Sequence, residues 1–167
     1  LAVIASGAAI GADVEIGAYA VIGEHVVIGE GTKIYPHVFL DGWTSIGKHC
    51  TIFPGASIGS EPQDLKFIGE KSYVFIGDHT TIRECATVSR ATGEGEETRI
   101  GSHCLMMAYT HVAHNCTVGN YVIMSNAATL AGHVLVEDRA VIGGLAGVHQ
   151  FVKIGRNAMI GGASKVV

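Results

Sequence analysis

Aromatic side chains are scarce in this chain of 167 residues, where they make up 7% of a sequence that is 48% hydrophobic. A buried core must therefore consist of aliphatic and small side chains. Clusters of Lys and Arg are also missing, because eleven basic residues are scattered among fifteen acidic ones and the formal net charge is −4. Nucleic acid and other polyanions are therefore not expected as partners.

Long apolar runs are missing as well, because Gly, Asp, Glu or His interrupts the sequence every few residues. No segment approaches the roughly 20 residues that a membrane span requires. The sequence also shows no basic segment followed by an apolar one, the arrangement that directs secretion. We expect no membrane span and a cytoplasmic protein.

What the sequence contains instead is a repeat of six residues. Aliphatic residues recur at this spacing from Ile4 to Val166, and only Asp64, Glu70 and Glu94 break the series. The residue after the aliphatic one is most often Gly, and the fifth residue of each hexad, counted from the aliphatic one, is small or β-branched. An α-helix cannot produce this period, whereas a short strand followed by a tight turn can.

The repeat predicts an all-β fold, a parallel β-helix with three strands in each coil and with coils stacked ~4.8 Å apart. The aliphatic and small residues would point into a narrow interior, and Gly or Asn would permit the turns. We expect residues 1–167 to form a single β-helix domain. The three breaks in the repeat predict two excursion loops, at about residues 60–73 and 90–98.

The repeat also separates ordinary histidines and cysteines from unusual ones. The histidines at the fourth position of a hexad, where a solvated turn is expected, are His25, His37, His49, His79, His103 and His133. The histidines outside that position are His111, His114 and His149, of which His149 is equally consistent with a packed corner. Three cysteines take the small inward position and one a turn, so we expect reduced thiols rather than disulfides or zinc ligands: Cys50, Cys104, Cys116 and, at the turn, Cys85.

Six segments occur in a characteristic order along the chain: QDLK (63–66), IRE (82–84), HVAHNCTVGN (111–120), NAATLAGHV (126–134), IGGLAGVHQF (142–151) and IGGAS (160–164). Together they resemble the acyl-ACP:UDP-N-acetylglucosamine O-acyltransferases, a family of hexapeptide-repeat enzymes that opens lipid A biosynthesis. The resemblance implies a left-handed parallel β-helix, a homotrimer, and acyl transfer from acyl-carrier protein to the 3-hydroxyl of UDP-N-acetylglucosamine. It implies no cofactor besides the acyl-ACP donor.

The chemistry implied by this resemblance requires a base, because a sugar hydroxyl is a poor nucleophile at neutral pH. An imidazole, with an ordinary pKa near ~6.5, suits that task, and we interpret His114 as the base. The resemblance assigns stabilisation of the oxyanion to the backbone N–H of Gly132. No Ser or Cys stands in a recognisable nucleophile–base arrangement, so a covalent acyl-enzyme is not expected.

The resemblance also implies a set of substrate-binding residues: Gln63, Asp64, Lys66, His111, His133, Gln150 and Gly162. The residues of the first loop would contact the sugar and its phosphates, while the two histidines and Gln150 would line the donor and sugar sites. Gly162 has no side chain and would leave room for a long acyl chain. In the family the sites lie between the β-helices of a trimer, so His114 and Asp64 are expected to meet across a subunit boundary.

The sequence departs from the family pattern in three places. Asn115 follows the base where an acidic residue is common, and an amide can orient an imidazole but cannot stabilise its cation as a carboxylate would. Residues 89–92 read SRAT where HRGT is common. The helical region that ends the family's chains is absent from this sequence, so we expect a C-terminal segment to be missing.

Other readings of the sequence remain open. Hexapeptide-repeat carbonic anhydrases rely on histidines five residues apart, a pair that does not occur here, so no metal is expected; zinc held by His111, His114 and a neighbouring subunit's histidine is the alternative. The chain is also compatible with another hexapeptide acyltransferase, either the N-acyltransferase of the same pathway or an enzyme dependent on acetyl-CoA. A further alternative is a truncated, non-catalytic trimeric scaffold.

Overall fold

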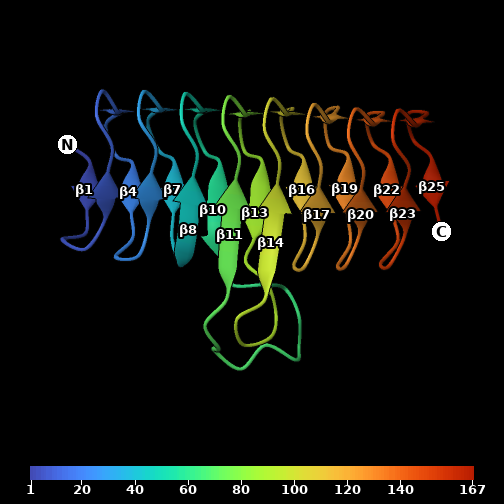
Figure 1. The fold of residues 1–167 in the computed structure, drawn as a ribbon, viewed down its shortest axis with the longest axis horizontal. Helices are drawn as coiled ribbons and strands as arrows, with labels where there is room; N and C mark the ends of the chain where they lie inside the picture. The colour runs from blue at the N-terminus through green and yellow to red at the C-terminus, as the bar shows by residue number, and fades with distance from the viewer.

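The computed structural model describes residues 1–167, which fold into 25 short strands without a helix. Every strand pairing is parallel, and the strands form three sheets that wind around one axis as a left-handed parallel β-helix. Figure 1 shows the resulting prism, with the two chain ends at opposite ends of its long axis. The structure contains no helix long and apolar enough to cross a membrane.

The strands alternate among the three sheets in chain order. Sheet A contains β1 (Val3–Ile4), β4 (Val21–Ile22), β7 (Phe39–Leu40), β10 (Ser57–Ser60), β13 (Thr87–Ser89), β16 (His111–Val112), β19 (Thr129–Leu130), β22 (Gly147–Val148) and β25 (Lys165–Val166). Sheet B contains β2 (Ala9–Ile10), β5 (Val27–Ile28), β8 (Trp43–Ile46), β11 (Tyr73–Ile76), β14 (Glu97–Ile100), β17 (Thr117–Val118), β20 (Leu135–Val136) and β23 (Lys153–Ile154). Sheet C contains β3 (Glu15–Ile16), β6 (Lys33–Ile34), β9 (Thr51–Ile52), β12 (Thr81–Ile82), β15 (Leu105–Met106), β18 (Ile123–Met124), β21 (Val141–Ile142) and β24 (Met159–Ile160).

The register of the sheets follows the hexad repeat. Val3 pairs with Val21, and Val21 pairs with Phe39, so equivalent positions of successive coils stack directly on one another. The sequence separation between paired residues of adjacent coils increases only where a loop lies between them, as for Ser57 and Thr87. The predicted fold class is therefore confirmed.

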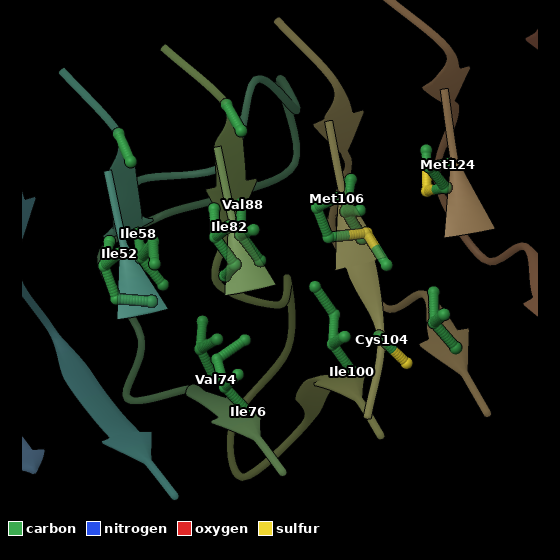
Figure 2. Close-up of a cluster of buried hydrophobic side chains, with 14 of the residues drawn as sticks. Ile52, Ile58, Val74, Ile76, Ile82, Val88, Ile100, Cys104, Met106 and Met124 are labelled. Carbon is green, nitrogen blue, oxygen red and sulfur yellow. The ribbon is translucent and has the colours of Figure 1, made fainter. Parts of the chain in front are cut away.

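The core is a single column of aliphatic and small side chains. Ile52, Ile82 and Met106 succeed one another inside sheet C, and Figure 2 shows such residues of neighbouring coils packed side by side. The cluster comprises 34 buried residues. The small residue at the fifth position of the hexad is buried in the same way, as Cys104 and Cys116 illustrate, and this confirms that part of the sequence interpretation.

The corners of the prism differ from the sequence prediction in how they turn. At most corners the residue with positive φ is the fourth of the hexad and is not Gly, as in His49 (φ 52°) and Asn115 (φ 58°). The glycine that follows the aliphatic residue has another purpose, because a Cβ on Gly29 would lie 2.6 Å from the backbone carbonyl of Gly47 in the next coil. These glycines let successive coils approach closely, so for them the prediction of a turn was wrong. At the fourth position, however, Gly31 and Asn115 do permit turns as predicted.

Two excursions leave the prism, and both are at the corner between sheets A and B. The first loop (residues 61–72) joins β10 to β11, and the second loop (residues 90–96) joins β13 to β14 one coil later. Figure 1 shows them protruding together from the middle of the prism. They are tied to each other, because Gly93 N–H donates to Glu70 Oε1 (2.7 Å) and Lys71 N–H donates to Glu94 Oε2 (3.0 Å).

Candidate active site

His114 lies at the same corner as the two loops, one coil beyond the second loop, in the turn between β16 and β17. The first loop reaches back over this corner, so that Asp64 Oδ2 lies 3.8 Å from His114 Nε2. Both side chains are largely enclosed, with exposed fractions of 14% for His114 and 18% for Asp64. The corner therefore places an imidazole and a carboxylate face to face in a partly desolvated site.

The contact between His114 and Asp64 forms within one chain. From the family resemblance we expected these residues to meet across a subunit boundary, and that expectation was wrong. The physical reason is the length and direction of the first loop, which leaves the prism two coils before His114 and folds along the shared corner instead of pointing away from it.

Gly132 forms the wall beneath the imidazole. It belongs to the turn between β19 and β20, one coil beyond His114, and it is buried. A Cβ at this position would lie 2.5 Å from His114 Cε1 and 2.6 Å from Nε2, so only glycine leaves space for the ring. The backbone N–H of Gly132 donates to no group within the chain. An unpaired donor therefore lies beside the ring of the predicted base.

Two further histidines flank His114. His133 packs edge-on against it, with ring centroids 5.2 Å apart, and stacks on Phe151 at 4.8 Å. His111 lies on the outer face of β16, where its Nδ1 is 2.7 Å from Thr87 Oγ1. Burial is the main cause that lowers the pKa of both flanking histidines, and the neighbouring charge of His114 lowers it further. Both therefore favour the neutral form next to His114.

Asp64 is held in its charged form. The backbone N–H of Lys66 donates to Asp64 Oδ1 (3.0 Å), and this hydrogen bond is the main cause that lowers the pKa of the carboxyl group; the nearby charge of His114 adds to it. The side chains of Lys66 and Gln63 are exposed and form no ion pair or hydrogen bond within the chain. The first loop thus presents one fixed anion and one free cation beside the imidazole.

The remaining predicted residues lie farther from His114. Gln150 is exposed at the same corner, two coils beyond His114, between β22 and β23. Gly162 lies between β24 and β25, at the corner between sheets C and A, so one chain does not bring it to the imidazole. Between these positions, the outer face of sheet A carries a largely apolar hollow of about 340 Å³. Its lining includes Thr129, the strand partner of His111, and Ala131, the neighbour of Gly132.

The contacts of Asn115 were predicted only in part from the sequence. Its Oδ1 lies 2.9 Å from His114 Nδ1, within hydrogen-bond distance of the imidazole. The involvement of the second loop was not foreseen: Thr92 forms two hydrogen bonds to the same amide. No group of three or more His, Cys, Asp or Glu side chains in the chain is arranged to hold a metal ion.

Comparisons with known proteins agree with this architecture. Residues 7–42 match the family described as bacterial transferase hexapeptide (six repeats). An acyl-[acyl-carrier-protein]–UDP-N-acetylglucosamine O-acyltransferase of Gloeothece citriformis is 53% identical over 129 residues, which are 77% of this chain and 47% of that relative.

Solved structures are similar over nearly the whole chain. LpxA from Acinetobacter baumannii superposes with a TM-score of 0.97 and 45% identity, over 99% of this chain and 64% of that one. LpxA from Bacteroides fragilis, a UDP-N-acetylglucosamine acyltransferase, superposes with a TM-score of 0.67 and 35% identity, over 96% of this chain and 67% of that one. The chain spans about half the length of the curated relatives it matches and about two thirds of these structures.

Proposed function

Because this chain belongs to the hexapeptide-repeat family of UDP-N-acetylglucosamine O-acyltransferases, we propose that it transfers a 3-hydroxyacyl chain from acyl-carrier protein to the 3-hydroxyl of UDP-N-acetylglucosamine. This is the first step of lipid A biosynthesis, and we place it in the cytoplasm. The observation that carries the proposal is the convergence of His114 Nε2, the Asp64 carboxylate and the unpaired N–H of Gly132 at one enclosed corner.

The reaction follows from the chemistry of these groups. His114 Nε2 accepts the proton of the sugar hydroxyl while the hydroxyl oxygen forms a bond to the thioester carbonyl carbon. The N–H of Gly132 donates to the oxyanion of the tetrahedral intermediate. Collapse of the intermediate breaks the C–S bond, and the imidazolium returns its proton to the departing thiolate. The charged Asp64 carboxylate, 3.8 Å from Nε2, stabilises the imidazolium in between.

The substrates are bound by the groups around this centre. Lys66, whose ammonium has no partner in the chain, and Gln63 contact the diphosphate of the nucleotide sugar. The apolar hollow on sheet A receives the acyl chain, because it begins next to His111 and Gly132. His133 and Gln150 line the same corner. No cofactor takes part besides the acyl-ACP donor.

We further propose that the chain acts as a homotrimer. Gly162 lies on a different corner from His114, so it contributes to the acyl site only if a second prism places it there. Its missing side chain then leaves room for a long acyl chain.

One assay tests the function. The protein is incubated with UDP-N-acetylglucosamine and 3-hydroxyacyl-ACP, and the 3-O-acyl product is measured by mass spectrometry. Replacement His114→Ala should reduce the rate by roughly 10²–10⁴-fold, whereas His103→Ala, which removes an exposed turn histidine outside the site, should not.

Two outcomes would overturn the proposal. Transfer from acetyl-CoA with no use of acyl-ACP would identify an acetyltransferase. Transfer from neither donor, also after fusion to the part of the Gloeothece citriformis relative that this chain lacks, would identify a non-catalytic scaffold.

A further inference from the structure

We propose that Arg90 is a positioning residue, which fixes the first loop and thereby holds Asp64 beside His114. Lys66 of the same loop is held with it. The inference rests on the proposed function, in which Asp64 acts on the imidazole and Lys66 on the nucleotide sugar. It depends on four observations, namely the place of the Arg90 side chain, its contacts with the first loop, the path from those contacts to Asp64, and the charge that is buried.

Arg90 lies beneath the root of the first loop. It is the first residue of the second loop, and its backbone N–H donates to the carbonyl of Ser60 (3.0 Å), the last residue before the first loop. Arg90 is only 8% exposed, and its side chain reaches back to the coil of β8, where a Cβ on Gly42 would lie 3.1 Å from Nη1. The missing side chain of Gly42 therefore leaves the space that the guanidinium occupies.

The guanidinium of Arg90 contacts the first loop at three points along its course. Nη1 lies 3.5 Å from the carbonyl oxygen of Gly59, just before the loop begins. Nη2 lies 3.6 Å from Oε1 of Glu61, the first residue of the loop. Cζ lies 5.0 Å from the centre of the Phe67 ring, a separation at which a guanidinium and an aromatic face attract each other. The first loop therefore folds around one side chain that belongs to the neighbouring coil.

Phe67 connects Arg90 to the part of the first loop that faces the imidazole. Phe67 N–H donates to the carbonyl of Asp64 (3.0 Å) and closes a tight turn. Within this turn Lys66 N–H donates to Asp64 Oδ1 (3.0 Å), and Asp64 Oδ2 is the atom that lies 3.8 Å from His114 Nε2. Arg90 thus holds the residue that ends the turn, and the turn presents Asp64 and Lys66 to the site.

The far end of the first loop is tied to the second loop. Glu70 accepts the N–H of Gly93 (2.7 Å) and Glu94 accepts the N–H of Lys71 (3.0 Å), so each loop contributes one carboxylate to the other. The hydrogen bond from Gly93 is the main cause that lowers the pKa of Glu70, and the nearby charge of Arg90 adds to it. The first loop is thus fixed at its root, its middle and its end, and Arg90 acts at the first two of these places.

The charge of Arg90 is only partly compensated. Its buried Nε donates to no group in the chain, and both Nη contacts are long for hydrogen bonds. Burial of an incompletely paired cation costs free energy, and an apolar side chain of similar size often serves stability equally well or better. The guanidinium adds direction, because it lies over the Phe67 ring while its two ends face Gly59 and Glu61. This combination favours a role in placing the loop over a role in stabilising the fold.

The first experiment observes the loop without any reaction. Hydrogen–deuterium exchange, followed by mass spectrometry, is measured for residues 61–72 and for the three sheets. Arg90→Met removes the charge but keeps an unbranched side chain, and it should accelerate exchange in residues 61–72 by about tenfold while the sheets stay unchanged. The matched control is Arg99→Met, because Arg99 also lies over a phenylalanine (Phe75, 4.7 Å) and pairs with a glutamate (Glu97, 2.9 Å) but is exposed on sheet B. It should leave exchange in the first loop unaltered.

A second variant approaches the same contact from the loop. Phe67→Leu removes the aromatic face without disturbing a buried charge, and Phe67 is only half-buried and outside the core. It should accelerate exchange of the first loop in the same way. It also tests the contact where Arg90→Met does not fold.

The second experiment uses the acyl-transfer assay in a double-mutant cycle. Arg90→Met should raise the KM for UDP-N-acetylglucosamine and lower kcat, each by roughly threefold to tenfold, because Lys66 and Asp64 are both displaced. In the Asp64→Asn background the same replacement should lower kcat by less than about twofold, because the carboxylate that it displaces is already gone. Arg99→Met should alter neither constant.

The outcomes separate this inference from the proposed function. Unchanged exchange in residues 61–72 of Arg90→Met would refute the role of Arg90; if that variant does not fold, Phe67→Leu decides in its place. Faster exchange throughout the prism, or equal losses of kcat with and without the Asp64 carboxylate, would refute it too, because Arg90 would then support the whole fold. The expected exchange without any acyl transfer would leave the anchoring of the loop intact and remove the proposed function instead.

Discussion

The Nε2 atom of His114 lies 3.8 Å from Oδ2 of Asp64, although the two residues belong to different coils. This separation is too long for a direct hydrogen bond but short enough for a strong response to charge. Because the pKa of Asp64 is lowered, chiefly by the N–H of Lys66, the carboxyl group is ionised at neutral pH. It interacts weakly with a neutral imidazole and favourably with an imidazolium, so its influence is greatest after the base has taken up a proton.

The first prediction concerns this carboxylate. Asp64→Asn keeps the shape of the side chain but removes its charge, and we expect kcat to fall by about tenfold to a hundredfold, less than for His114→Ala. The acidic limb of the pH–rate profile should move to lower pH, because the imidazolium loses its counter-charge. A change confined to KM would instead assign Asp64 to sugar binding alone.

The second prediction concerns the wall beneath the imidazole. Gly132→Ala would place a methyl group 2.5 Å from His114 Cε1, and the ring cannot move aside without breaking its hydrogen bond to Asn115. We expect a loss of about tenfold to a hundredfold in kcat with a nearly unchanged melting temperature, because the methyl group meets a side chain and not the core. Unaltered turnover of this variant would show that the ring is free to shift.

The third prediction concerns the glycines between coils. Gly29→Ala should destabilise the protein by about 1–3 kcal/mol, because its Cβ would lie 2.6 Å from the backbone of Gly47. Gly155 is the matched control, since it occupies the same position of its hexad and an added Cβ would meet nothing within 4 Å. Gly155→Ala should be neutral or stabilising by up to ~1 kcal/mol. Urea unfolding of both variants measures the difference, and equal effects would refute the role of close coil packing.

The fourth prediction concerns acid stability. The pKa of His111 and of His133 is lowered in the folded protein, mainly by burial, so between the folded value and the unfolded value near ~6.5 the unfolded chain binds more protons. Stability should therefore decrease as the pH falls from 7 through ~6.5 and level off below the folded pKa values. Melting temperatures measured between pH 7.5 and 5.5 should show this decrease, and His111→Gln should reduce it. A melting temperature that rises on acidification would contradict the assignment.

The fifth prediction concerns the thiols. Burial raises the pKa of Cys104 and of Cys116 to about 11 and also raises that of Cys50, whereas Cys85 is exposed at a corner. Iodoacetamide at pH 7.5 should therefore modify Cys85 alone in the folded protein and all four cysteines after denaturation. Peptide mass spectrometry locates the label. Cys85→Ala should take up none while folded.

The fold could be predicted from the sequence because the hexad repeat fixes both the inward and the outward positions of every strand. The aliphatic series led directly to the observed core and to the breaks at Asp64, Glu70 and Glu94. The role of the glycines could not be obtained in this way, because a close approach between coils and a left-handed turn both favour Gly and leave the same signal in the sequence.

The site was harder to predict from the sequence, because its contacts are made by residues of the loops. His114 stood out by its place in the hexad, but nothing in a repeat indicates the path of a loop that leaves it. Asp64 contacts His114 of the same chain, and Thr92 forms two hydrogen bonds to Asn115. Both contacts depend on how the excursions fold back over their corner. Such contacts cannot be predicted from the spacing of residues in the repeat.

Stacked coils divide the prism axis into equal increments of ~4.8 Å. A group that belongs to the repeat can change its height only by a whole increment, which is far coarser than the tolerance of a proton transfer. Both excursions begin and end at one corner, so finer adjustment falls to side chains such as Asp64 that are outside the repeat. Differences in substrate among related chains should accordingly reside in the length and sequence of the excursions, or in the gain and loss of entire coils.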